Sequence, residues 1–303
     1  MLCYAAKRIF LAIATVLIVA AIVFFAMHCI PGGPFDSEKA TDPAAKAALQ
    51  SRFHLDKSVP EQFVLYLGGA LRGDWGISLK TGREVSDMVF GALGVSARLG
   101  AVSMLGAALL GLALGCASAV WHSRAADRLI LLMTTLFVAV PSFLLATLLL
   151  LVFCLKLGWF GVWSASGTGY VLPVISLMMY PMAYITRLTR SSMLEALHQD
   201  YVRAARVRGV REGAVVARHA LKNAVTPVIA YLGPMTAYTL TGSMVVENVF
   251  TIGGLGSRFV ESIANRDYPV VMAATIVLAA LIALSALLSD LLCRAIDPRI
   301  DFA

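Results

Sequence analysis

Long apolar stretches without any Asp, Glu, Lys or Arg alternate with charged segments along this chain. A helix needs ~20 apolar residues to cross a hydrocarbon layer of ~30 Å, and it satisfies its own backbone polar groups there. The pattern therefore predicts an all-α membrane protein with six transmembrane helices. The six stretches cover residues 9–35, 99–123, 129–155, 157–186, 223–246 and 268–289. The fourth helix is expected to begin near Tyr170, because residues 158–169 are rich in Gly and Ser.

The first stretch follows Lys7 and Arg8, and in this respect it resembles a secretory signal. Its apolar core at residues 9–27 is longer than the ~7–15 residues of a signal's hydrophobic region. No A-x-A cleavage site follows it. We therefore predict a retained transmembrane helix.

These stretches divide the chain into four parts. We predict a first transmembrane helix at 9–30, an extracytoplasmic loop at 31–98, a five-helix core at 99–292 and a cytoplasmic tail at 293–303. Within the core, residues 189–224 form a polar cytoplasmic segment between two helices.

The loop at 31–98 shows the spacing of short amphipathic helices. Ser58 and Glu61 form a capping box with Pro60 in the first turn. Two open interpretations are a plain surface loop and an outer lid or docking surface for a substrate-delivery partner, and we favour the second. The apolar positions expected on the helix faces are Phe63, Leu67 and Leu71, then Val85, Met88, Val89 and Leu93.

Composition and charge support a membrane protein and orient it. Hydrophobic residues make up 59% and charged residues 14%, against ~45–50% and ~25% in soluble domains. With the N-terminus in the cytoplasm, the inner segments hold fourteen of the 25 basic residues but only seven of the 18 acidic ones. The positive-inside rule then places both termini in the cytoplasm. It also accounts for the net charge of +7 without a nucleic-acid partner.

Several residues within the predicted spans are expected to shape the membrane part. Gly100, Gly106, Gly111 and Gly115 suit close helix packing, although they do not name the partner helix. Glu247, at the outer end of the fifth span, is interpreted as an interfacial carboxylate that faces water. The residues that line a substrate path stay unknown. Five prolines are expected to free backbone carbonyls inside the spans: Pro141, Pro173, Pro181, Pro227 and Pro234.

Catalytic and metal chemistry find little support in the sequence. The five cysteines and five histidines are scattered, without C-x-x-C or H-E-x-x-H spacing, so no metal site is predicted. No serine-protease or paired-aspartate arrangement is present, and we predict that the chain is not an enzyme. A stand-alone secondary transporter is the alternative from another class, but no internal repeat or midspan charge favours it.

The cytoplasmic segment at 189–224 is the candidate functional site. Together with Arg187 just before it, the segment carries eight basic residues, and Gly209 is expected to end its first helix. It is too short for a separable DNA-reading domain. We interpret it as an exposed helical knob that transmits force from a cytoplasmic partner. Leu194, Leu197, Tyr201 and Ala205 are predicted to share one helical face.

The same segment resembles the cytoplasmic loop of importer-type ABC transporter permeases. Residues 201–209 read YVRAARVRG, and RHALKNA at 218–224 precedes Pro227. The general family pattern has Glu and Pro where this chain has Arg203 and Lys222, and both departures resemble the peptide-transporting branch. Further matches occur in order at residues 31–35 (PGGPF), 71–76 (LRGDWG), 246–250 (VENVF), 253–256 (GGLG), 265–269 (NRDYP) and 296–299 (IDPR).

On these motifs the chain is identified as similar to the B-type permease subunits of bacterial oligopeptide and dipeptide ABC importers. PGGPF and the tail lean toward oligopeptides, while nickel and glutathione importers share most of the motifs and remain alternatives. The resemblance implies half of a translocation channel in the bacterial inner membrane. It also implies a C-type permease, two cytoplasmic ATPases, an extracytoplasmic peptide-binding protein and surrounding lipid as partners.

The resemblance further implies where ATP acts and which residues meet the ATPase. No G-x-x-x-x-G-K-[ST] motif occurs in this chain, so ATP and Mg²⁺ are expected on the partner ATPases, with no cofactor here. Gly209 would let the backbone turn, and Ala204 and Ala205 would permit close helix approach. The implied coupling residues are Tyr201, Arg203, Ala204, Ala205, Arg206, Arg208 and Gly209.

Overall fold

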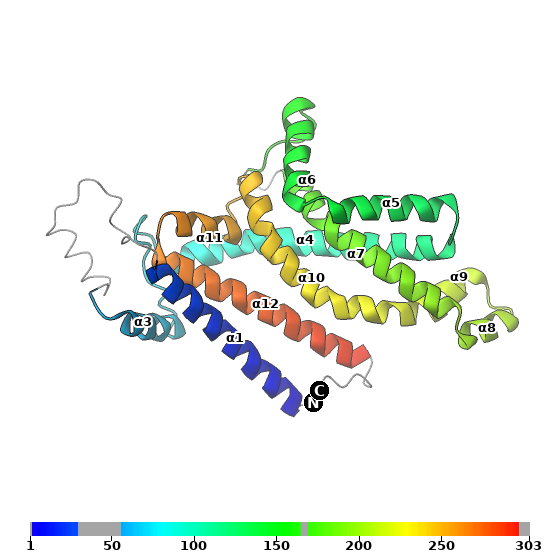
Figure 1. Ribbon diagram of the computed structural model, residues 1–303, viewed down its shortest axis with the longest axis horizontal. Helices are drawn as coiled ribbons and strands as arrows, with labels where there is room; N and C mark the ends of the chain where they lie inside the picture. The colour runs from blue at the N-terminus through cyan, green and yellow to red at the C-terminus, as the bar shows by residue number, and fades with distance from the viewer. Residues whose placement is uncertain (1, 30–55, 165–168, 297–303) are drawn as a thin grey trace. The chain divides into compact units, whose positions relative to one another are not determined.

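The computed structural model describes residues 2–29, 56–164 and 169–296, which form helices (Figure 1). Within these ranges the only β-type pairing is an isolated antiparallel bridge between Ile77 and Glu84. The PGGPF motif at 31–35 and most of the IDPR motif lie outside the described residues. The α-helices are α1 (Leu2–Cys29), α3 (Val59–Leu71), α4 (Val85–Val120), α5 (Ala125–Ala139), α6 (Ser142–Leu149), α7 (Val171–Leu197), α8 (Asp200–Val207), α9 (Glu212–Ala214), α10 (Leu221–Val249), α11 (Leu255–Ala264) and α12 (Tyr268–Ile296). Two π-helical segments, η1 (Leu150–Lys156) and η2 (Val215–Ala220), complete the set.

The chain forms two compact units. The first comprises Met1–Ser96 and Gly253–Ala283, and the second comprises Ala97–Ile252 and Leu284–Ala303. Two of the three boundaries fall inside the continuous helices α4 and α12, and the third lies between α10 and α11.

The apolar intervals are helical, but the count of six spans stays a prediction. Four helices of the described part are long and apolar enough to cross a membrane, and a bent pair makes up to five. The four fall in α1, α4, α7 and α12. Helix α10 covers the fifth predicted interval but lies outside this set.

The third predicted span is bent rather than straight. Helices α5 and α6 meet at an angle of 100°, at a break next to Pro141. Proline has no backbone N–H to donate and clashes with the preceding turn, so a helix ends before it. The segment is therefore a broken span or a re-entrant pair.

In the first unit, α3 packs on α1 and on the first half of α12. Phe24 and Met272 belong to a buried apolar cluster, against which Phe63 and Tyr66 of α3 lie. The Tyr66 hydroxyl donates to the Pro269 carbonyl oxygen at 3.4 Å, and burial raises the pKa of Tyr66. The predicted capping box is confirmed, because Glu61 accepts from the Ser58 N–H at 3.2 Å.

Two details of the loop prediction are wrong. Val85 and Val89 are buried as expected, but they begin α4 itself and do not form a separate short helix. Leu71 is 89% exposed rather than packed with Phe63, because it occupies the last position of α3, where a turn follows.

Polar contacts fasten α11 within the first unit. Ser96 Oγ of α4 accepts from the Leu255 N–H at 2.8 Å. Asp267, which is 4% exposed, accepts from Ser78 Oγ at 2.5 Å and from the Leu79 N–H at 3.0 Å. The turn after α3 is thereby tied to the start of α12.

In the second unit, α7 packs against α5, α6 and α10 (Figure 1). The buried side of α7 includes Met182 and Ile185, which form a cluster with Met104 of α4 and Val228 of α10. The structure also identifies the partner helix of the α4 glycines. A Cβ atom at Gly115 would lie 2.5 Å from Thr189 Cβ, so α7 approaches α4 too closely for a side chain there.

Candidate functional site

Residues 200–220 form a helical knob between α7 and α10, made of α8, α9 and η2 (Figure 1). The first helix ends as predicted. Gly209 adopts φ 75°, its N–H donates to Arg206 O at 2.9 Å, and the Val210 N–H donates to Ala205 O at 3.2 Å. This pair of bonds is a Schellman motif, which reverses the chain where a left-handed residue is needed.

The knob has a small apolar core of its own. Val202 and Ala205 of α8 pack with Val215 of η2, and Val210 lies against them. The predicted face is therefore wrong in part, because α7 ends at Leu197 and a new helix starts at Asp200. That break rotates Tyr201 outward, where it is 40% exposed, while Ala205 stays 5% exposed.

The predicted coupling residues divide into an inner and an outer set. Ala205 lies inside the knob, where it packs in the apolar core. Val207 is 88% exposed and was missed by the sequence analysis, although its place three residues after Ala204 puts both near one outward side. The outer set, which we call the α8 face, is Tyr201, Arg203, Ala204, Val207 and Arg208.

Charge on the knob is mainly positive and solvent-facing. Arg206 Nε lies 2.7 Å from Glu212 Oε1 and ties α8 to α9. Arg203 Nη1 lies 3.7 Å from Asp200 Oδ1. Both side chains are exposed, so this pair contributes little to stability. The α8 face therefore combines an apolar centre with arginines at its edge, which suits an acidic groove with an apolar floor.

The knob is joined firmly to the long helices. Ala220 of η2 and Ala224 of α10 pack with Met193 and Ala196 of α7 and with Ala119 of α4. Small side chains let these segments approach closely, so the knob is packed directly against α7 and α10. The π-helical η2 lies at this junction, and such segments are frequent at functional sites.

A buried ion pair braces α7 against the turn between α4 and α5. Asp127, which is 2% exposed, lies 2.8 Å from Arg190 Nε and accepts from Ser118 Oγ at 2.5 Å. The Ser123 N–H donates to it at 2.9 Å. His122 Nδ1 lies 3.0 Å from Arg190 Nη2. Sequence reasoning missed this brace, because the residues are distant in the chain and belong to no motif.

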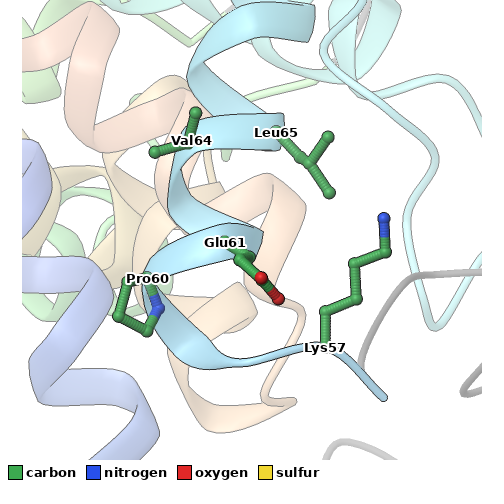
Figure 2. A pocket seen from close by; sticks show the side chains of 5 residues that line it. All are labelled: Lys57, Pro60, Glu61, Val64 and Leu65. Carbon is green, nitrogen blue, oxygen red and sulfur yellow. The ribbon is translucent and has the colours of Figure 1, made fainter.

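The loop helix α3 in the first unit presents a partly apolar outer side. Figure 2 shows an open hollow on it, lined by Pro60, Val64 and Leu65, with Lys57 and Glu61 at its edge. Val64 is 67% exposed and Leu65 is 45% exposed. Such a surface is compatible with the predicted docking of a delivery partner, which stays a prediction.

The interpretation of Glu247 as a water-facing carboxylate is wrong. Glu247 is 0% exposed, and its carbonyl oxygen accepts from the Ile252 N–H at 2.7 Å in the turn that ends α10. The chain folds back over the end of the helix there. Glu247 is therefore part of the packed end of α10.

The chain is similar to one family over most of its length. Residues 111–302 match the model of the binding-protein-dependent transport system inner membrane component. This region begins within α4 and includes α7, the knob and α10.

Full-length relatives are also similar to the chain. The dipeptide transport system permease protein DppB of Bacillus subtilis (strain 168) is 39% identical over 98% of this chain and 97% of its own length. The oligopeptide transport system permease protein OppB of Haemophilus influenzae is 37% identical over 100% of both chains. OppB of Escherichia coli (strain K12) is 36% identical, also over 100% of both.

Proposed function

Because the chain belongs to the family of binding-protein-dependent transport system inner membrane components, we propose that it is the permease subunit of an ATP-driven peptide importer. It forms half of the channel, and oligopeptides are the favoured substrate. The names of the full-length relatives support a peptide substrate and do not favour nickel or glutathione.

The observation that carries the mechanism is the knob between α7 and α10. It has its own core, an exposed α8 face and close packing onto two long helices. An ATPase that binds this face and moves by a few ångströms would move both α7 and α10 along with the knob. Force would then reach the membrane part without any nucleotide on this chain.

The remaining parts of the importer are proposed to be separate chains. ATP and Mg²⁺ are bound and hydrolysed by two cytoplasmic ATPases, and this subunit contributes transport and no catalysis. A C-type permease supplies the other half of the channel. An extracytoplasmic binding protein delivers the peptide and docks on the outer side of α3, where Val64 and Leu65 are exposed. The complex lies in the bacterial inner membrane, with both termini of this chain in the cytoplasm.

Uptake by cells that lack only this chain tests the proposal. Labelled tripeptide, dipeptide and nickel ion are each compared with uptake in complemented cells, with and without cellular ATP. We expect loss of ATP-dependent tripeptide uptake and its return on complementation. Loss of dipeptide uptake alone would correct the peptide length, and loss of nickel uptake alone would refute the peptide substrate. Survival of all three would refute the function.

A further inference from the structure

Arg187 of α7 occupies an unusual environment. Its side chain is exposed in the second unit, and Nη2 donates to Thr135 Oγ1 of α5 at 3.2 Å. Three residues further along α7, Arg190 pairs with the buried Asp127 carboxylate. Among the described residues, the hydrogen-bond partner of Arg187 is thus a neutral hydroxyl, whereas Arg190 has a charged one.

The guanidinium of Arg187 extends away from the knob, toward the charge-free part of α7. Helices α5 and α7 run in opposite directions, since Asp127 meets Arg190 while Thr135 meets Arg187. At 1.5 Å per residue, Thr135 lies about 12 Å beyond Asp127, but Arg187 lies only about 4.5 Å beyond Arg190. The side chains of Arg187 and Arg190 therefore diverge along α5, and Arg187 reaches Thr135 within the charge-free stretch 129–155.

This direction is the reverse of what lipid would favour. Arginines near the end of a membrane helix usually extend their charged heads back to the interface. A cation turned the other way needs water or an anion within reach, because an unpaired charge in hydrocarbon costs several kcal/mol. The geometry therefore indicates that Arg187 faces a polar path and not acyl chains.

Tyrosines continue the same face of α7. Tyr180, Tyr184 and Arg187 are spaced by four and three residues, which places them on one side of a helix. The Tyr184 ring stacks on Tyr231 of α10 at 4.1 Å between centroids, with 14° between the planes. All three tyrosines are half-buried, so each keeps part of its surface open.

A surface formed by these three tyrosines suits a peptide of variable sequence. A tyrosine ring contacts apolar side chains, while its hydroxyl exchanges hydrogen bonds with a backbone. Free peptides of every sequence share a terminal carboxylate and a terminal ammonium group, and of these a guanidinium can hold the carboxylate with two parallel hydrogen bonds.

We propose that Arg187 binds the C-terminal carboxylate of the peptide cargo during its passage, with Tyr180, Tyr184 and Tyr231 forming the amphipathic wall beside it. This proposal rests on the proposed function as a peptide importer. Carboxylate binding must be weak and transient, because the cargo has to leave. Arg187 therefore acts on the rate of passage and does not hold the cargo permanently.

The test compares two cargoes in the complete transporter, reconstituted in proteoliposomes with its ATPases, second permease and binding protein. One tripeptide carries a free C-terminus and the other is its C-terminal amide, and the binding protein is preloaded to saturation with each. The variants are Arg187→Gln, Arg187→Lys as the change that keeps the charge, and Ser191→Ala as a control on the same exposed face. Each uptake rate is divided by the wild-type rate for that cargo, which removes the preference of the binding protein.

We expect Arg187→Gln to lower uptake of the free acid about ten-fold, the effect of losing one charge-assisted bidentate contact, and to leave the amide nearly unchanged. Arg187→Lys keeps the charge but loses the two parallel hydrogen bonds, so it should lower free-acid uptake less than Arg187→Gln does, and Ser191→Ala should match wild type. Equal losses for both cargoes would overturn the proposal, because they would assign Arg187 to a carboxylate of the partner permease or to structure. No loss for either cargo would also overturn the proposal. If the wild-type complex imported neither cargo, the proposed function itself would fail.

Discussion

Asp127 and Arg190 form an ion pair whose carboxylate is almost fully buried, at 3% side-chain exposure. Breaking such a pair from one side is costly, because the remaining charge stays inside without a counter-ion. We expect Asp127→Asn to lower the free energy of unfolding by about 3 kcal/mol. The measurement is the thermal unfolding midpoint of the purified complex in detergent.

A double variant and an exposed pair control this prediction. Adding Arg190→Gln to Asp127→Asn should recover part of the loss, since the unpaired cation is then gone. Glu212→Gln breaks the pair with Arg206, whose side chains are 40% and 67% exposed, and should cost less than about 1 kcal/mol. Equal costs for Asp127→Asn and Glu212→Gln would contradict the assignment of a buried brace.

Gly115 is the second position where one residue decides packing. A methyl group there would lie 2.5 Å from Thr189 Cβ and 2.7 Å from the Thr186 carbonyl oxygen, so α4 and α7 would have to separate. We expect Gly115→Ala to destabilise the protein by about 1–3 kcal/mol, the usual cost of overpacking. Chemical denaturation of the purified protein, followed by far-UV circular dichroism, measures the change.

Gly94→Ala is the matched control on the same helix. No atom lies within 4 Å of a Cβ placed at Gly94, so the better helix propensity of Ala should leave stability unchanged or raise it by up to about 1 kcal/mol. If both substitutions destabilised the protein equally, close contact between α4 and α7 would not be the cause.

At the residue scale, the sequence identified the important small residues but not their contacts. The spacing of Gly106, Gly111 and Gly115 predicted close packing, and only the structure names α7 as the partner. Ala204 and Ala205 were both expected to permit close helix approach, yet Ala204 is exposed and Ala205 is buried. A motif fixes residue types, whereas the direction of each side chain depends on where the helix starts.

At the scale of elements, the α8 helix depends on its left-handed terminus. Gly209 has φ 75°, a conformation that costs a residue with a Cβ roughly 1–2 kcal/mol. We expect Gly209→Ala to loosen the end of α8 and to speed amide hydrogen exchange in residues 202–210. Exchange measured by mass spectrometry on the intact complex tests this.

Gly213→Ala controls for the loss of a glycine. Gly213 lies in α9 without a positive φ, and no atom lies within 4 Å of a Cβ placed there. Gly213→Ala should therefore leave the amide hydrogen exchange rates of α8 the same as in the wild type. If Gly213→Ala changed α8 as strongly as Gly209→Ala, the special role of the Schellman turn would be wrong.

Helix ends were more predictable than helix directions. The capping box before α3 and the stop at Gly209 were both predicted, because each depends on a few adjacent residues. The 100° bend at Pro141 was not, since proline alone does not say whether a helix kinks or folds back. The break between Leu197 and Asp200 likewise removed a predicted continuous face.

At the scale of the whole molecule, composition and apolar patterning were enough to predict the class of protein. The chain is an all-helical membrane permease of its family, as the intervals and motifs indicated. Its buried brace and its tyrosine wall depend on contacts between helices that are far apart in the sequence. Those contacts come from the packing of α7, and no local pattern announces them.

ATP hydrolysis is proposed to reach this subunit through the α8 face. Val207→Asp tests it, because an 88% exposed side chain can be changed without disturbing the knob core. The matched control is Glu195→Gln, at an exposed position of α7 outside the knob.

The most direct measurement is peptide-stimulated ATP hydrolysis and peptide uptake by the reconstituted complex, together with the amount of ATPase that co-purifies. We predict that Val207→Asp lowers uptake and stimulated hydrolysis at least ten-fold by weakening the ATPase contact, and that Glu195→Gln behaves as wild type. Normal uptake by Val207→Asp, with normal amounts of ATPase bound, would contradict the claim.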